Sequence, residues 1–395
     1  MLDKIRSWMF FLLGSFIALS CTGQNNESHQ TVNSESMDCD PITEATADNC
    51  IHLNEIQVFG THNSYKLTPH PDLVEKLNET TPGWSENLNY EHRPIKEQLG
   101  ELDVRQLELD IFADPEGGHY AEPRGAIMIG DEEFIRPEEM LEPGFKVLHV
   151  QDLDYRTNCL TLKSCLQKTR DWSLENSSHL PILIMIEVKQ RPRDDRGSFS
   201  FTKPVEFDVD LMHEIDQEIW DVFDQEHVLT PDDVRGDYET LEEAVLEKGW
   251  PSLRESRGKV FFALDNTDET RTLYLSGSPS LQGRAMFVSA PPGEPAAGFI
   301  KMNNAIDSHD RIRERISAGY IIRTRSDLPV QEAKTGDGTR LEAALSTGAQ
   351  YISTDYPEPS PFGSGYIAEF PDTEEAGRCN PVNAPASCRN IFITE

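Results

Sequence analysis

Hydrophobic runs of strand length recur through the central part of the chain, and polar residues or glycine bound each of them. Alternating or continuous apolar runs of this length are typical of β-strands. The run PILIMI is apolar throughout, as expected of a parallel strand that is buried on both faces. The predicted strands are residues 55–60, 105–112, 146–151, 181–189, 258–265, 285–290, 319–325 and 349–356.

Segments of helical periodicity lie between several of these strands. Thr240 with Glu243 and Thr339 with Glu342 fit the capping box at a helix start, and Gly348 stands where a helix end favours a left-handed residue. The predicted helices are residues 159–176, 207–226, 240–249, 309–319 and 339–348.

This alternation predicts an α/β protein, a TIM-type (β/α)8 barrel that is regular or distorted. An open doubly wound sheet is the alternative, but no glycine-rich turn of the kind a nucleotide needs follows the first strand.

The first residues, MLDKIRSWMFFLLGSFIALSC, have the pattern of a secretory signal peptide. Lys4 and Arg6 precede an apolar run that is too short to span a bilayer comfortably. Cys21 resembles the lipidated cysteine of bacterial lipoproteins, although Ala18 stands where leucine is usual, and an ordinary cleaved signal is the alternative. We therefore predict export, either as a lipoprotein at the outer surface or in the periplasm, or by secretion.

Four regions follow from these patterns: a signal peptide over 1–21, a flexible polar tether over 22–50, a catalytic barrel over 51–360 and a covering tail over 361–395. The six cysteines after Cys21 fall in three pairs that are close in sequence, which in an oxidising compartment favours small disulfide loops. The predicted bonds are Cys39–Cys50, Cys159–Cys165 and, in the tail, Cys379–Cys388.

Composition adds a restriction on partners. With 36 Lys+Arg against 69 Asp+Glu, the net charge of −33 argues against a nucleic-acid partner. Screening limits this repulsion to about 10 Å, so a locally basic or metal-filled pocket could still hold an anion.

Functional groups of such barrels lie at the carboxyl ends of the strands. In order along the chain, the polar residues at the predicted strand ends are His62 and Asn63, Glu108 and Asp110, His149, Glu187 and Lys189, Asp265, Ser289, Arg323 and Arg325, and Asp355.

Glu108 and Asp110 are two residues apart, so on a strand they point to the same side. Buried carboxylates need a cation, a shared proton or a salt bridge. With Glu187 and the amide oxygen of Asn63 they form an all-oxygen set that suits Ca²⁺. The alternative is that these acids pair with the basic residues Arg105, Lys189, Arg323 and Arg325.

His62 and His149 are predicted to flank the acidic strand. One base and one acid across a shared cavity is the arrangement that proton transfer at a phosphodiester requires. Lys189, Arg323 and Arg325 could bind the substrate by neutralising phosphate oxygens, unless they only pair with the acids.

The segments THNSY, ELDIF, VLHVQDLDY, PILIMIEVK and GYIIRTRSD resemble the calcium-dependent phosphatidylinositol-specific phospholipases C of bacteria, which are similar to the catalytic barrel of the eukaryotic enzymes. The resemblance extends from about residue 53 to residue 388. It implies a TIM-type barrel, one calcium ion and two catalytic histidines. The residues that match are Asn63, Glu108, Asp110 and Glu187 as calcium ligands, and His62 and His149 as the catalytic pair.

The implied reaction is attack of the inositol 2-hydroxyl on phosphorus, which yields diacylglycerol and a cyclic inositol phosphate. His149 is expected to protonate the leaving oxygen, and His62 to stabilise the phosphoryl group or act as base; Glu108 could itself be the base.

The eukaryotic relatives hold ring phosphates with lysines on the fifth strand, where this chain has Asp265, so plain phosphatidylinositol or a similar phosphodiester is expected. Membrane contact is expected from a lipid on Cys21 or from apolar rim residues near Phe134.

Two alternatives stay open at this point. A glycerophosphodiester phosphodiesterase has a similar barrel, metal site and use of histidines, but its first motif is usually His-Arg-Gly. A noncatalytic lipoprotein could have kept the scaffold to bind a glycan or a lipid head group. The insertion at 113–145 is expected to cover the site.

Overall fold

The parallel strands follow one another in the order of a TIM-type barrel. This computed structural model describes residues 38–195 and 199–395, and the eight parallel strands lie within those ranges. They are β1 (Ile56–Thr61), β2 (Gln106–Phe112), β4 (Ile182–Val188), β5 (Val260–Leu264), β6 (Met286–Val288), β7 (Phe299–Lys301), β8 (Ile321–Arg325) and β9 (Tyr351–Thr354).

The strands divide into two sheets, with the orders β10-β1-β9-β8-β7 and β3-β2-β4-β5-β6. Each sheet ends in a short antiparallel strand, β10 (Gly377–Cys379) beside β1 and β3 (Lys146–Val147) beside β2. A single parallel bridge between Ser289 and Phe299 links β6 to β7. No ladder joins β1 to β2 within the described residues. The predicted barrel is therefore confirmed in a distorted form.

Polar side chains close the seam between β1 and β2. The Thr61 hydroxyl bonds to the Gln98 side-chain oxygen at 2.7 Å, and the Gln106 amide donates to the Thr61 carbonyl at 3.2 Å. Gly60 permits this approach, because a Cβ there would lie 2.4 Å from Cβ of Gln106. Since buried polar groups need partners, this network takes the place of a backbone ladder.

The predicted third strand, 146–151, is wrong as a barrel strand. Only Lys146 and Val147 are extended, they run antiparallel to β2, and His149 lies on the loop that follows. The missing barrel strand is β7, in which only Phe299 and Ile300 are apolar, too short a run to be recognised.

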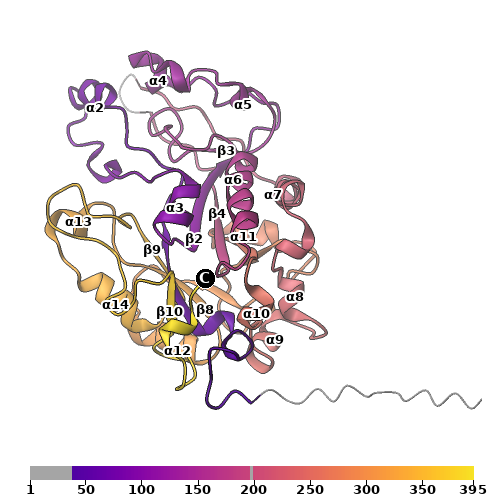
Figure 1. The fold of residues 1–395 in the computed structure, drawn as a ribbon. Coiled ribbons are helices and arrows are strands. Elements are labelled where there is room, and N and C mark those ends of the chain that lie inside the picture. Colours follow the sequence, from indigo (N-terminus) through magenta and orange to yellow (C-terminus); the bar gives the residue numbers. More distant parts are fainter. Residues whose placement is uncertain (1–37, 196–198) are drawn as a thin grey trace, which may run out of the picture. The chain divides into compact units, whose positions relative to one another are not determined.

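Helices cover the outside of the strands, and α2, α4 and α5 lie beyond the carboxyl end of β2 (Figure 1). The α-helices are α1 (Ala47–Cys50), α2 (Pro71–Asn78), α3 (Ile95–Glu101), α4 (Arg124–Ile129), α5 (Glu138–Leu141), α6 (Leu162–Glu175), α7 (Val209–Val222), α8 (Pro231–Arg235), α9 (Leu241–Glu247), α10 (Leu253–Ser256), α11 (Glu269–Tyr274), α12 (His309–Ser317), α13 (Gln331–Thr335) and α14 (Thr339–Thr347). Short 3-10 helices are η1 (Leu53–Glu55), η2 (Glu86–Leu88), η3 (Glu132–Phe134), η4 (Gln225–His227) and η5 (Asn390–Phe392).

All five predicted helices are present, as α6, α7, α9, α12 and α14. The Thr240–Glu243 capping box is confirmed at the start of α9. The Thr339–Glu342 capping box is wrong, because Thr339 is already the first helical residue and Gly338 precedes it without a side-chain cap. Gly348 ends α14 at φ 78°, in the left-handed region as predicted.

The three predicted disulfides are confirmed, with Cα–Cα distances of 5.6, 5.3 and 6.1 Å in chain order. Of the predicted tether, residues 38–50 carry α1 and the Cys39–Cys50 bond. The predicted signal peptide and Cys21 lie outside the described residues, and the four region boundaries stay predictions. In the described part of the chain, no helix has the length and apolarity that a bilayer span requires.

One buried carboxyl fastens the insertion 113–145 to the barrel. The Glu218 side chain, on α7, accepts a hydrogen bond from the backbone N–H of Phe145 at 3.1 Å. Burial raises the pKa of Glu218 from 4.5 to about 7, against the opposing effect of this hydrogen bond. The folded chain thus holds this proton over a pH range in which the unfolded chain has lost it.

We predict that this carboxyl makes stability fall as pH rises from about 4.5 to about 7, because the folded state binds more protons there. Glu218→Gln keeps an acceptor oxygen without the charge, so it should be more stable than the parent at pH values above this range, by about 1–3 kcal/mol. Urea unfolding at acidic and alkaline pH measures this. Glu214→Gln, at an exposed position on the same helix, is the control. The prediction fails if both variants keep the parent's pH dependence.

Candidate active site

A polar cavity of about 430 Å³ opens at the carboxyl ends of β4, β5 and β7. Its lining includes His149, Glu187, Lys189, Asp265 and Lys301. Carboxyl strand ends are where barrels of this type carry their functional groups. No residue of the insertion 113–145 lines this cavity, so the predicted cover is not observed there.

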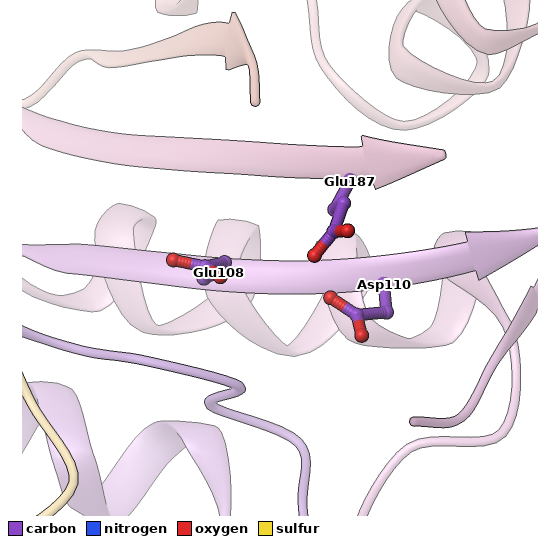
Figure 2. A group of neighbouring side chains, drawn as sticks. All are labelled: Glu108, Asp110 and Glu187. Carbon is purple, nitrogen blue, oxygen red and sulfur yellow. The ribbon is translucent and has the colours of Figure 1, made fainter. Parts of the chain in front are cut away.

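Three carboxylates converge beside this cavity (Figure 2). Asp110 on β2 and Glu187 on β4 are register partners in the parallel ladder, and their side chains point toward each other. Glu108 lies two residues earlier on β2, and the oxygen atoms of the three groups that could bind a metal lie within 4.8 Å of one another. Glu108 and Asp110 are fully buried, whereas Glu187 is partly exposed.

Two basic side chains face these acids, as the alternative interpretation of the sequence allowed. Arg323 contacts Glu108. The Lys189 ammonium lies 2.9 Å from Asp110 Oδ2 and 2.9 Å from Glu187 Oε1. Burial still dominates: it raises the pKa of Glu108 to about 7 and the pKa of Asp110 well above its ordinary range.

Asn63 has the features of a ligand to a cation. Its backbone is left-handed, with φ 53°, a conformation that asparagine tolerates better than most residues. The adjacent Ser64 N–H donates to the Glu108 carbonyl at 2.9 Å, which holds this turn against β2. The Asn63 amide nitrogen donates to the Tyr90 hydroxyl at 2.7 Å, and its oxygen is buried with no hydrogen-bond partner. This orphaned amide oxygen is a donor of the kind that Ca²⁺ prefers.

His62 is fixed in one tautomer by its neighbours. Its Nδ1 lies 2.8 Å from Asp355 Oδ1, and Arg325 donates to its Nε2 at 3.3 Å. Because arginine can only donate, the proton of the neutral ring is assigned to Nδ1 and the lone pair to Nε2. Burial, with help from Arg325, lowers the pKa of His62 well below its usual range. Nε2 of His62 lies 3.6 Å from Glu108 Oε1.

His149 has its own carboxylate. Its Nδ1 lies 2.7 Å from Asp154 Oδ2, which is also 3.5 Å from the ammonium of Lys66. Burial lowers the pKa of His149, although Asp154 opposes this effect. The contact with Asp154 orients the ring of His149, which lines the polar cavity.

The two arginines predicted to bind substrate are engaged by protein groups. Arg323 is almost completely buried and donates to the Ser353 hydroxyl at 2.8 Å and to the Asn303 amide oxygen at 2.7 Å. Arg325 donates to Asp355 at 3.0 Å. Their contacts position Glu108 and His62, while a role in binding phosphate stays a prediction.

Some residues that contact the predicted site residues were not predicted from the sequence. Asp154 lies five residues after His149 in a polar loop, where its spacing gave no signal. Lys301, which contacts Asp265, sits on the strand that was missed. Phe134 is buried against Tyr155, with ring centroids 5.6 Å apart, so the expected exposed apolar contact at this residue is wrong.

Comparison with known proteins identifies the family. The model of the family described as Ca²⁺-dependent phosphoinositide phospholipase C matches residues 51–381. The chain belongs to this family. Members of this phospholipase C family are phosphodiesterases, so the chain is an enzyme that cleaves phosphodiesters of the phosphatidylinositol class. The match favours this family over the glycerophosphodiester phosphodiesterases. A comparison with curated proteins found no match.

Solved structures of phospholipases C are similar in fold. The Ca²⁺-dependent enzyme from Streptomyces antibioticus has 18% identity and a TM-score of 0.50, over 78% of this chain and 95% of that one. The calcium-dependent enzyme from a Pseudomonas species has 16% identity and a TM-score of 0.49, over 82% and 97%. The enzyme from Listeria monocytogenes has 12% identity and a TM-score of 0.43, over 80% and 93%.

We predict that Asp355→Asn lowers turnover of a phosphodiester substrate roughly 10- to 1,000-fold, because an amide at this position can donate to Nδ1 of His62 and displace the ring proton to Nε2. The measurement is steady-state kinetics beside a circular dichroism check of the fold. Asp72→Asn is the matched control, since Asp72 lies 3.9 Å from a surface histidine, His70. Equal, small effects in the two variants would contradict the assignment.

Proposed function

We propose that the chain is a calcium-dependent phospholipase C that converts phosphatidylinositol to diacylglycerol and a cyclic inositol phosphate. The observation that carries this proposal is the cluster of Glu108, Asp110 and Glu187, with His62 beside it and the carboxylate-oriented His149 at the adjoining cavity. The family match supplies the reaction class.

Asn63, Glu108, Asp110 and Glu187 would hold the calcium ion. Together they offer the oxygen ligands that Ca²⁺ takes, including the orphaned amide oxygen of Asn63. When bound, Ca²⁺ lowers the pKa of the attacking hydroxyl and offsets charge on the phosphoryl oxygens. Lys189 now bridges Asp110 and Glu187, so its ammonium would move toward the cavity and the substrate phosphate.

Two groups can accept the proton of the inositol 2-hydroxyl. They are Nε2 of His62, which carries the lone pair of the neutral ring and accepts a hydrogen bond from Arg325, and the carboxylate of Glu108, 3.6 Å away. We propose that Arg323 and Arg325, which contact Glu108 and His62, also offset the charge that develops on the phosphoryl group.

His149 acts on the other side of phosphorus. When the 2-hydroxyl oxygen of inositol forms its bond to phosphorus, the bond between phosphorus and the diacylglycerol oxygen breaks, and the diacylglycerol oxygen takes a proton from His149. The anionic phosphodiester raises the proton affinity of a neighbouring imidazole, and Asp154 stabilises the imidazolium that results.

The cavity suits an inositol ring without extra phosphates. Asp265, at the end of β5, neutralises Lys301, so this wall offers no unpaired positive charge to a ring phosphate. Plain phosphatidylinositol is therefore the proposed substrate.

The three disulfides are consistent with an exported protein. We propose a lipoprotein anchored through Cys21 or a secreted enzyme, with a barrel over 51–360 and a covering tail over 361–395. Its tail side chain Tyr366 donates to the carbonyl of Ser326 at 3.0 Å, just beyond the strand that carries Arg325.

The test is turnover of phosphatidylinositol micelles by the exported protein with calcium or with chelator, followed by phosphorus NMR of the product. We predict a cyclic inositol phosphate signal that needs calcium and falls roughly 100- to 10,000-fold in His149→Ala. His309→Ala, at the first residue of α12, should leave the cyclic inositol phosphate signal unchanged. Glycerol 3-phosphate as product, or no turnover with calcium bound, would refute the proposal.

A further inference from the structure

A second cavity differs from the first in being mainly apolar. This groove has a volume of about 590 Å³, within the roughly 300–1,000 Å³ range of small-molecule sites. It lies where α2 and α4 pack together beyond the carboxyl end of β2 (Figure 1). Its apolar lining is Leu77, Trp84, Met128, Leu153, Phe199 and Phe201.

One loop separates the groove from the polar cavity. His149 and Gln151 line the polar cavity, whereas Leu153 lines the groove. The loop is tightly held, because Val150 and Asp154 exchange backbone hydrogen bonds of 3.1 and 2.9 Å. The proposed acid and the apolar groove therefore lie on opposite sides of one short, fixed turn.

The leaving group of the proposed reaction, diacylglycerol, indicates which ligand the groove could bind. His149 is proposed to protonate the diacylglycerol oxygen, so the glycerol and its acyl chains must leave the polar cavity near this loop. Polar side chains line most of the cavity where the head group reacts, which gives the chains no favourable surface there. The groove presents an apolar surface behind the same loop.

Charge supports the same occupant. With a net charge of −33, the chain gains no long-range attraction to anionic lipid surfaces. Affinity for a lipid must then come mainly from apolar contact. We propose that the groove of Leu77, Trp84, Met128 and Leu153 binds an acyl chain of the lipid substrate, an inference that rests on the proposed function.

The test separates binding of an acyl chain from adsorption to a surface. The full exported chain, with calcium, is assayed on monomeric dibutanoyl, dihexanoyl and dioctanoyl phosphatidylinositol below their micelle concentrations. Each buried methylene is worth about fourfold in kcat/KM, so the parent should gain several-fold or more with each step in chain length. Met128→Asp should flatten this series and leave the value for the dibutanoyl lipid within about twofold of the parent.

Ile127→Asp is the matched control. Ile127 precedes Met128 on α4 and is 55% exposed, but it does not line the groove. It should keep the parent's dependence on chain length. The inference is overturned if Met128→Asp keeps that dependence, if it lowers activity equally on all three lipids, or if Ile127→Asp flattens the series as strongly.

Fluorescence provides a second measurement that needs no turnover and covers the case in which Met128→Asp does not fold. A monomeric phosphatidylinositol brominated on its acyl chain should quench the parent more than Trp84→Phe, because Trp84 lines the groove. Equal quenching in the two proteins would overturn the inference. If the parent cleaves none of the three lipids, the proposed function fails, while quenching at Trp84 still decides whether the groove binds an acyl chain.

Discussion

The convergence of three carboxylates on adjacent strands, two of them fully buried, is the constraint on which the rest of this site depends. The parallel register of β2 and β4 sets Asp110 beside Glu187, with Glu108 one pleat away. Buried negative charge is costly unless it is compensated, which explains why Arg323 reaches Glu108 from the opposite sheet and Lys189 bridges the other two acids. A bound cation would relieve the same cost and would free Lys189 for the substrate.

The same compensation ties the two sheets together. β8 carries Arg323 and Arg325, which contact Glu108 and the His62–Asp355 pair, so one strand positions both Glu108 and His62. No ladder joins β1 to β2 in the described chain, and the residues after β1 are instead held to β2 through Ser64 and Glu108. The break in the barrel between β1 and β2 therefore lies beside the residues of the site. An apolar groove for an acyl chain would extend this site from head group to lipid tail.

Much of this arrangement could be predicted from the sequence, because long apolar runs, paired cysteines and polar strand ends each have a direct physical cause. Glu108 and Asp110 were predicted to share a side from strand periodicity alone, and the structure brings them together with Glu187. Other features depend on tertiary context. β7 has only two apolar residues and so shows no pattern. The predicted strand 146–151 begins with β3, which pairs antiparallel with β2 at the edge of the sheet and is not a barrel strand. Phe134 resembles a rim residue in sequence but is buried against Tyr155.

We propose that Asn63, Glu108, Asp110 and Glu187 form a calcium site. A crystal structure of the protein with Ca²⁺ is the measurement that tests this assignment. We expect one ion with oxygen atoms of these four residues at about 2.3–2.6 Å, and the Lys189 ammonium displaced from between Asp110 and Glu187. An ion bound elsewhere, or Lys189 still bridging the two acids at saturating calcium, would contradict this assignment.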